Sequence, residues 1–309
     1  MTTIQLPGLA GEIAQYLDEQ SPISSPRMAM GGSTALLGAI VSTGWELPHI
    51  TPYPVPSILK VLPDIDIEDI PTTQHLGLSV MLVAKPGHGK GCIIEGVELL
   101  LDRLPPTVRQ RLRTIQHMNH LALAGMEPGA ESELKRKGCI GPATYEKLSD
   151  GSCFLLTEST PETFQHQLPH WYGDSELYGG LLVIQHLGPK VRKSISPQLL
   201  PPTGLLERLN QLIKAPGEHK KRIEVTADAV NCYRQFWRYD MDAYCDHGPI
   251  GLEGAWARQS LQIAAILAVG INPLHPVVTT DLFRFSGSIA SDGIRKAREG
   301  LVSVAGVDA

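Results

Sequence analysis

The chain has 309 residues, which is enough for one large domain or two modest ones. Hydrophobic residues make up 42% of it and charged residues 19%, so the composition excludes an intrinsically disordered protein and provides for a buried core. A net charge of −5 excludes a uniformly basic surface that would coat nucleic acid, but it leaves room for local basic patches.

The cysteines and the apolar runs indicate the cellular compartment. The five cysteines are dispersed and form no C-x-x-C pair, a pattern that favours reduced thiols over a disulfide framework. The first residues lack a basic stretch followed by an apolar core, and no apolar run reaches the length of about 18 residues that a membrane helix needs. We therefore expect a cytoplasmic protein without a signal peptide and without membrane association.

Residues 1–75 predict an N-terminal helical segment followed by a connector. Residues 8–19 have apolar side chains at helical spacing on one face. A second helix over residues 27–43 is built of small and apolar residues, so we expect it to be buried on most sides. Residues 48–71 hold too many prolines for a long helix and predict short strands or turns.

A glycine-rich loop that ends in lysine follows the apolar run of residues 78–83. Backbone N–H groups of such a loop wrap phosphates, the lysine reaches the outer ones, and a helix start directly after the loop favours an anion. Residues 92–104 do have apolar side chains at helical spacing. We therefore predict an ATP-binding phosphate loop in which Gly87 and Gly89 form the tight turn and Lys90 supplies the charge. The predicted nucleotide-binding residues are Pro86, Gly87, His88, Gly89, Lys90, Gly91 and Cys92.

The loop departs from the consensus G-x-x-x-x-G-K-[ST] at two positions. Ala84 stands where the first glycine is expected, and Gly91 stands where a hydroxyl normally holds Mg²⁺. The requirement for Mg²⁺ therefore stays open: the loop belongs either to a nucleotide binder with altered metal handling or to a protein that has lost its chemistry. The simpler alternative is a glycine-rich connection between a strand and a helix, with a solvent-exposed lysine.

The middle of the chain predicts further units of the same sheet. A second helix starts within residues 105–113, residues 153–157 form a short buried strand, residues 160–168 form a helix that opens on Thr-Pro, and residues 180–185 form another apolar strand. Strands separated by helices favour a parallel sheet. We therefore predict an α/β P-loop NTPase-like core over residues 76–200.

A working phosphate-loop NTPase needs an acidic residue at the end of a neighbouring strand, where it orders Mg²⁺ and the attacking water. Glu158 stands at such a strand end, but Thr157 occupies the place of the expected aspartate. At the end of the next strand, Gln185 could orient a water and His186 could contact a phosphate. Glu158, Gln185 and His186 are therefore the catalytic candidates. The alternative for Glu158 is a helix-capping or solvent-facing acid, and the alternative for His186 is an ordinary polar residue at a strand end.

Two basic clusters are candidate nucleic-acid contacts. One lies in the polar, turn-rich stretch of residues 125–151, and the other follows the last apolar strand. Because the net charge is negative, any contact with nucleic acid must be local. A solvated loop, or a loop that docks an acidic protein partner, is the alternative. The candidate nucleic-acid-binding residues are Lys135, Arg136, Lys137, Lys190, Arg192 and Lys193.

Residues 201–309 predict a C-terminal region of helices only. Apolar and aromatic residues recur at helical spacing over residues 203–214, 226–244, 252–269 and 279–289. We expect the aromatic side chains of these helices in the core rather than at a cofactor.

The order of these features resembles a helicase-like domain of unknown function that occurs in primase–helicase proteins of phages, plasmids and integrated elements. The resemblance spans most of the chain and rests on short motifs. At the acidic pair of the family's strand motif, this chain has His186-Leu187. The matching motifs are Leu6-Pro7, Ala35-Leu36-Leu37, the strand of residues 78–83, the loop from Gly87 to Lys90, Thr160-Pro161-Glu162-Thr163-Phe164, the strand from Gly179 to Leu187, Val225-Thr226-Ala227 and the helix of residues 256–268.

The resemblance implies a RecA-like P-loop NTPase core, flanked by N-terminal helices and a C-terminal all-helical part. It also implies assembly into a ring or filament, and therefore a homo-oligomer. The implied partners are DNA and other protein subunits, and the implied process is the replication of a mobile genetic element. Gly91 and the missing acidic pair favour weak or absent ATP hydrolysis. The expected function is thus a degenerate, helicase-like, ATP-binding subunit of a larger nucleoprotein assembly.

Two other functions stay open. An active ATP-driven DNA helicase or translocase would show nucleotide hydrolysis that DNA stimulates. A nucleotide-dependent enzyme of another class, such as a small-molecule kinase, would need a lid that grips its substrate, and the predicted C-terminal helices do not obviously offer one.

Overall fold

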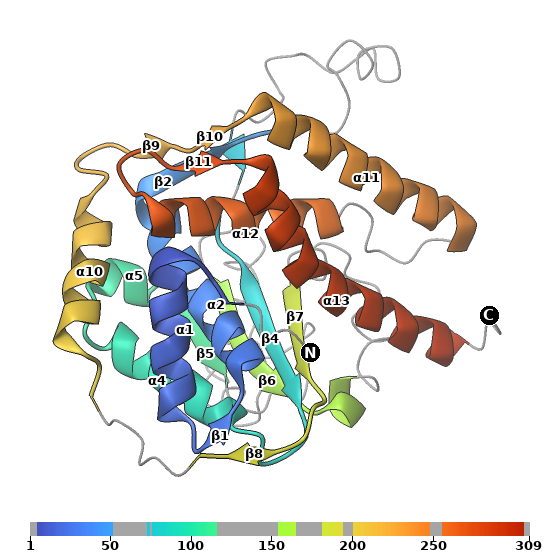
Figure 1. Ribbon diagram of the computed structural model, residues 1–309, viewed down its shortest axis with the longest axis horizontal. Coiled ribbons are helices and arrows are strands. Elements are labelled where there is room, and N and C mark those ends of the chain that lie inside the picture. Colours follow the sequence, from blue (N-terminus) through green and yellow to red (C-terminus); the bar gives the residue numbers. More distant parts are fainter. Residues whose placement is uncertain are drawn as a thin grey trace, which may run out of the picture.

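The computed structural model describes residues 5–51, 73–74, 76–115, 154–164, 181–193, 200–247 and 255–305. Its centre is a sheet of four strands, Ser79–Ala84 (β4), Leu112–Ile115 (β5), Phe154–Ser159 (β6) and Leu181–His186 (β7). They lie in the order β5-β6-β4-β7, and every pairing is parallel. All four strands therefore end at the same edge of the sheet, the lower edge in Figure 1. The prediction of an α/β fold with a parallel sheet is confirmed.

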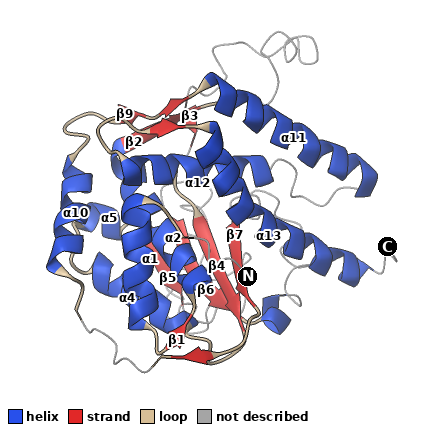
Figure 2. Ribbon diagram, viewed as in Figure 1, coloured by secondary structure: helices blue, strands red, loops and turns tan. Residues whose placement is uncertain are grey.

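One face of the sheet is covered by helices that come before and directly after β4 (Figure 2). They are Gly8–Gln20 (α1), Pro26–Gly44 (α2) and Lys90–Leu101 (α4). The helix α2 lies against all four strands, and α1 packs on α2 and α4. The close approach of α2 depends on Gly31, because a Cβ there would lie within 2.8–3.3 Å of the side chains of Leu82, Ile184 and Val80. As predicted, α2 is buried along most of its length.

A helix does start within residues 105–113, as predicted, but it is a single turn, Pro106–Arg109 (α5). The strand β5 follows shortly after it, at Leu112. The strand β5 is four residues long, lies at the end of the described sheet and carries the exposed Arg113, so no apolar run marks it in the sequence. After β6, the N–H of Thr163 donates to Thr160 Oγ1 at 3.2 Å, which is the N-cap bond that stabilises the start of a helix there.

The C-terminal region contains the four predicted helices, Thr203–Lys214 (α10), Ala227–His247 (α11), Ala255–Ile271 (α12) and Thr280–Ala305 (α13). The aromatic residues of α11 to α13 pack on one another, as expected of core residues. The ring of Phe236 lies 4.4 Å from that of Trp256 and 5.0 Å from that of Phe283. Helix α13 packs along β7 and α12 against α1 and α2, so this region closes one side of the sheet.

The prediction that residues 201–309 hold only helices is wrong, because several two-residue strands join distant segments. Lys221–Arg222 (β9) pairs with Trp45–Pro48 (β2), which also pairs with Thr73–Gln74 (β3). Glu224–Val225 (β10) pairs with Val277–Val278 (β11), and Ile23–Ser24 (β1) pairs with Val191–Arg192 (β8). Such short strands have no periodicity that the sequence could reveal.

The three predicted segments share one hydrophobic cluster, to which α1, α2, β4, β6, β7 and α12 all contribute. Among the helices in the described part of the chain, none is long and apolar enough to cross a membrane. Residues 52–72, the greater part of the proline-rich connector, lie outside the described residues.

We predict that Gly293→Ala destabilises the protein by about 1–3 kcal/mol, the usual cost of overpacking. A Cβ at Gly293 would collide with the backbone carbonyl of Val183, so α13 would have to move away from β7. The matched control is Gly204→Ala in α10, where a Cβ meets nothing within 4 Å and the change should be neutral or slightly stabilising. Urea unfolding curves measure both, and equal stabilities of the two variants would contradict the packing of α13 on β7.

Candidate functional site

The glycine-rich loop leaves the end of β4 and turns into α4 through two left-handed residues. Gly87 has φ +74° and Gly89 has φ +83°, a conformation that side chains other than glycine rarely adopt. Gly89 is the N-cap residue of α4, and no side chain caps the helix at this end. The first N–H groups of α4 therefore face the loop without a side-chain acceptor, which is the arrangement that suits a bound anion.

Lys90 is the first residue of α4, and its side chain is turned inward to the edge of the sheet. Its Nζ donates to the carbonyl oxygens of Ala84 at 2.5 Å and Ser159 at 2.8 Å, so it bridges the ends of β4 and β6. The side chain is only 6% exposed. Burial lowers the pKa of Lys90, and the negative charges of Glu158 and Glu162 act in the opposite direction. Two backbone oxygens therefore hold the amino group of Lys90 at the floor of the loop, and the charges of two carboxylates offset part of the effect of its burial.

The positions after Lys90 offer no metal-binding oxygen. Gly91 has no hydroxyl, and a Cβ there would meet nothing within 4 Å, so the place of the usual serine or threonine is open space. The next residue, Cys92, is half-buried, and its pKa is raised by burial, by Glu95 and by Glu158. Its thiol therefore stays protonated at neutral pH and is a poor nucleophile or metal ligand.

The strand register separates the three catalytic candidates. Glu158 lies opposite Leu82, and His186 lies opposite Ala84, so both side chains are on the face of the sheet that α2 and α4 cover. Gln185 lies opposite Val83, which places its side chain on the other face. Glu158 is buried close enough to Lys90 and Cys92 to act on both of their pKa values. The structure thus brings Glu158 to the loop and separates Gln185 from it.

His186 and His88 form a pair beside the loop. Their ring centroids are 5.9 Å apart, and Nδ1 of His88 lies 3.3 Å from the carbonyl oxygen of Pro86. The pKa of His186 is lowered by burial, then by the charges of His88 and Arg27, while a hydrogen bond to the backbone of Pro189 raises it. Near neutral pH His186 is therefore an uncharged polar group at the rim of the loop.

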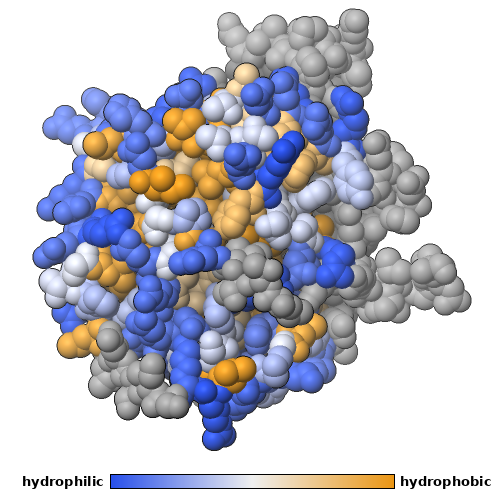
Figure 3. Space-filling view, viewed as in Figure 1, coloured by the Kyte–Doolittle hydropathy of each residue, from blue (hydrophilic) through white to orange (hydrophobic). Residues whose placement is uncertain are grey.

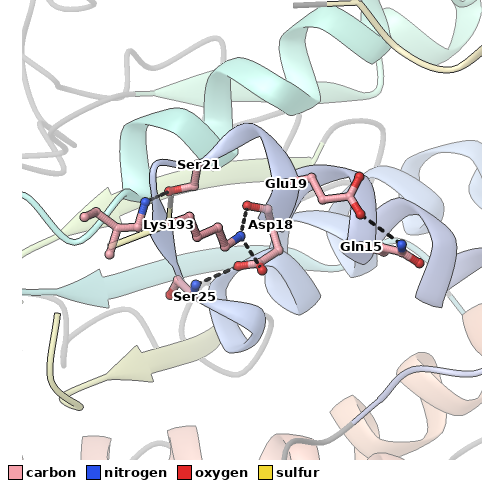
Figure 4. Close-up of polar contacts among 7 residues, drawn as sticks. Gln15, Asp18, Glu19, Ser21, Ser25 and Lys193 are labelled. Carbon is pink, nitrogen blue, oxygen red and sulfur yellow. Dashed lines mark hydrogen bonds and ion pairs between the residues drawn. The ribbon is translucent and has the colours of Figure 1, made fainter. Parts of the chain in front are cut away.

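The predicted basic cluster after β7 divides into residues with different contacts. Lys190 reaches the loop, since its Nζ lies 3.0 Å from the position that a Cβ would take at Gly87. Arg192 is exposed in β8. Lys193 is engaged within the protein, because its Nζ donates to Asp18 Oδ2 at 2.5 Å (Figure 4). The other predicted cluster, Lys135, Arg136 and Lys137, lies outside the described residues.

A two-stranded ribbon lies against the loop, and no pattern in the sequence predicts it. The strands β1 and β8 pair at the lower edge of the molecule in Figure 1, where the strands of the central sheet end. A Cβ at Gly89 would collide with Ser21 Oγ and lie 3.4 Å from the carbonyl oxygen of Ile23, so this ribbon touches the loop. Figure 3 shows hydrophilic side chains interspersed with hydrophobic ones at this end of the visible face.

Within the described ranges, no group of three or more His, Cys, Asp or Glu side chains is arranged to hold a metal ion. Comparison of the chain with protein-family models gives no match, and comparison with curated proteins gives none either. The candidate site therefore rests on its own geometry.

We predict that acidification destabilises the protein partly through His186. Its pKa in the folded state is lowered below about 6.5, the value of an unperturbed histidine, so between the two pKa values the unfolded chain binds more protons. The contribution of His186 is fully present above about pH 6.5 and declines as the pH falls toward the folded-state pKa. Urea unfolding at pH 7.5, 6.5 and 5.5 should show a smaller loss of stability for His186→Asn than for the wild type.

Burial lowers the pKa of His49 as well, so part of the pH dependence should remain in that variant. A His186→Asn variant with the full pH dependence of the wild type would show that His186 is not buried as described.

Proposed function

We propose that this protein binds ATP at the loop between β4 and α4 and is a degenerate member of the RecA-like P-loop NTPases. The observation that carries the proposal is the position of Lys90. Its ammonium is buried at the floor of a loop with two left-handed glycines, at the open start of a helix. Each of these features has a use when phosphate oxygens enter the loop: the glycines let the backbone approach, the N–H groups donate, and the lysine neutralises charge.

We further propose that ATP hydrolysis is weak or absent. Catalysis of phosphoryl transfer depends on electrostatic clamping of the transferred phosphate, in which Mg²⁺ is a central part. Gly91 provides no hydroxyl for Mg²⁺, and Thr157 precedes Glu158 where an aspartate is expected. Gln185, the candidate that could orient a water, faces away from the loop. The residues at the loop therefore fit a phosphate group better than they fit a metal-dependent hydrolytic centre.

The resemblance to helicase-like domains of mobile-element primase–helicases supports a role in DNA transactions. On this proposal the chain acts as a subunit of a larger nucleoprotein assembly and contacts DNA locally, because a net charge of −5 provides no general attraction for a polyanion. An active helicase or translocase would require hydrolysis that DNA stimulates, which the losses at Gly91 and His186-Leu187 disfavour.

We predict that Lys90→Ala weakens ATP binding at least about tenfold, the effect of losing one charge-assisted contact. Lys85→Ala is the matched control, because it removes the same charge from an exposed position at the start of the loop. Calorimetric titration measures both, and unfolding curves check that each variant is folded, since Lys90→Ala also leaves the carbonyls of Ala84 and Ser159 without their donor. Equal ATP affinities of wild type and Lys90→Ala would refute the proposed site.

We also predict that restoring the missing hydroxyl makes ATP binding depend on Mg²⁺. Gly91→Ser places an oxygen in open space next to Lys90, and Gly91→Ala adds the same Cβ without the oxygen. The affinity gained on adding Mg²⁺ should be larger in Gly91→Ser than in Gly91→Ala or the wild type.

We predict that the wild type releases phosphate much more slowly than about one per second, the rate of a slow active phosphoryl-transfer enzyme. A wild-type rate near one per second that Lys90→Ala abolishes would contradict the account.

A further inference from the structure

The connection between β7 and β8 crosses the glycine-rich loop because both of its ends are fixed. At one end, His186 of β7 pairs with Ala84, the last residue of β4. At the other end, β8 pairs with β1, and the N–H of Lys193 donates to the carbonyl of Pro22 at 2.9 Å. The few residues between these ends must therefore pass next to the loop that starts at Ala84.

Asp18, at the end of α1, holds the ribbon of β1 and β8 in place through hydrogen bonds and an ion pair. Its Oδ2 accepts from Lys193 Nζ at 2.5 Å, its backbone carbonyl also accepts from this ammonium, and its Oδ1 accepts from the N–H of Ser25 at 2.6 Å (Figure 4). Both ends of the ion pair are mostly buried, with side chains 18% and 19% exposed. Lys193 thus serves to position the connection, and it is not available to a ligand.

Lys190 is the residue that this arrangement brings to the loop. Its Nζ lies 3.0 Å from the Cβ position of Gly87, which is the left-handed glycine in the middle of the loop. Its side chain is exposed, and among the described residues no carboxylate forms an ion pair with it. Lys90 approaches the same loop from the buried side, where its ammonium lies at the ends of β4 and β6. Two amino groups are therefore placed at the loop, one buried at its floor and one exposed beside Gly87.

We propose that Lys190 is a second phosphate-contacting residue of this loop and that the polyphosphate tail of a nucleoside triphosphate is held between Lys90 and Lys190. This inference rests on the proposed function. A phosphate in the loop relieves the repulsion between the two cations and accepts a charge-assisted hydrogen bond from each. Lys190 also supplies positive charge to a loop in which Gly91 offers no ligand for a metal, so ATP is bound without Mg²⁺. Lys190 thereby belongs to the nucleotide site rather than to a nucleic-acid-binding patch with Arg192.

The test is a titration of the full chain with ATP in EDTA, comparing wild type, Lys190→Ala, Lys190→Arg and Arg192→Ala. Arg192 is the matched control, because it is exposed, carries the same charge and lies two residues away, in β8. Lys190→Ala should bind ATP roughly tenfold more weakly, the loss of one charge-assisted contact. Arg192→Ala should stay within about twofold, because a solvent-screened charge outside the loop contributes little. Lys190→Arg should retain most of the affinity.

The outcomes of the titration distinguish this inference from the proposed function. If the wild-type protein does not bind ATP, both the proposed function and the role of Lys190 are refuted. Wild-type binding that Lys90→Ala weakens and Lys190→Ala leaves unchanged overturns only the role of Lys190. Equal losses in Lys190→Ala and Arg192→Ala also overturn it, because they indicate a general effect of charge. A parallel titration with a single-stranded oligonucleotide covers the remaining alternative: a variant Lys190→Ala that loses oligonucleotide binding and keeps ATP binding assigns the residue to a nucleic-acid surface and overturns the inference.

Discussion

The candidate site depends on one buried cation, the ammonium of Lys90 at the ends of two adjacent parallel strands. Removing a charge from water costs several kcal/mol unless hydrogen bonds and opposite charges replace its hydration. Here the carbonyls of Ala84 and Ser159 accept from Nζ, and Glu158 and Glu162 provide negative charge. These groups meet only because β6 lies directly beside β4, so the strand order of the sheet is the condition for the site.

The same geometry supports the proposal that the site binds a phosphate group without hydrolysing it. The acceptors of Lys90 Nζ are the backbone oxygens of Ala84 and Ser159, and the charges of Glu158 and Glu162 oppose the lowering of its pKa by burial. The opposite wall is built from the ribbon of β1 and β8, which Asp18 and Lys193 hold against the loop. The buried Lys90 and the exposed Lys190 bring positive charge to the loop, whereas the positions that would coordinate Mg²⁺ or orient a water hold Gly91 and a glutamine on the other face of the sheet. Cationic groups at a loop favour the binding of a phosphate, but hydrolysis also requires the groups that stabilise its transition state.

The features that could be predicted from the sequence are those with long, regular patterns. The strands β4, β6 and β7 are nearly continuous apolar runs, as expected of strands buried on both faces, and the loop between β4 and α4 has its glycines in a recognisable order. The helices α1, α2 and α10 to α13 follow from apolar residues at helical spacing. The sequence therefore predicts that the loop residues and Glu158 belong to one site.

The remaining features depend on register and on contacts between distant segments. Gln185 and His186 are neighbours in the chain, but the alternation of a strand sends them to opposite faces, and only the pairing with Val83 and Ala84 shows which one faces the loop. Lys190 and Lys193 belong to one basic cluster in the sequence, yet Asp18, at the far end of the chain, engages one and leaves the other beside Gly87. The ribbon that separates their roles consists of two-residue strands, which are too short to leave a pattern.

The central claim, that phosphate is bound at this loop, is tested most directly by amide hydrogen–deuterium exchange of the full chain with and without saturating ATP in EDTA. The account predicts slower exchange in peptides that cover residues 84–93 and 186–193, because the loop N–H groups acquire phosphate acceptors and the facing connection closes on the ligand. Peptides from α10, on the outside of the protein, should exchange at the same rate in both states. Saturation with ATP that leaves exchange over residues 84–93 unchanged would contradict the account.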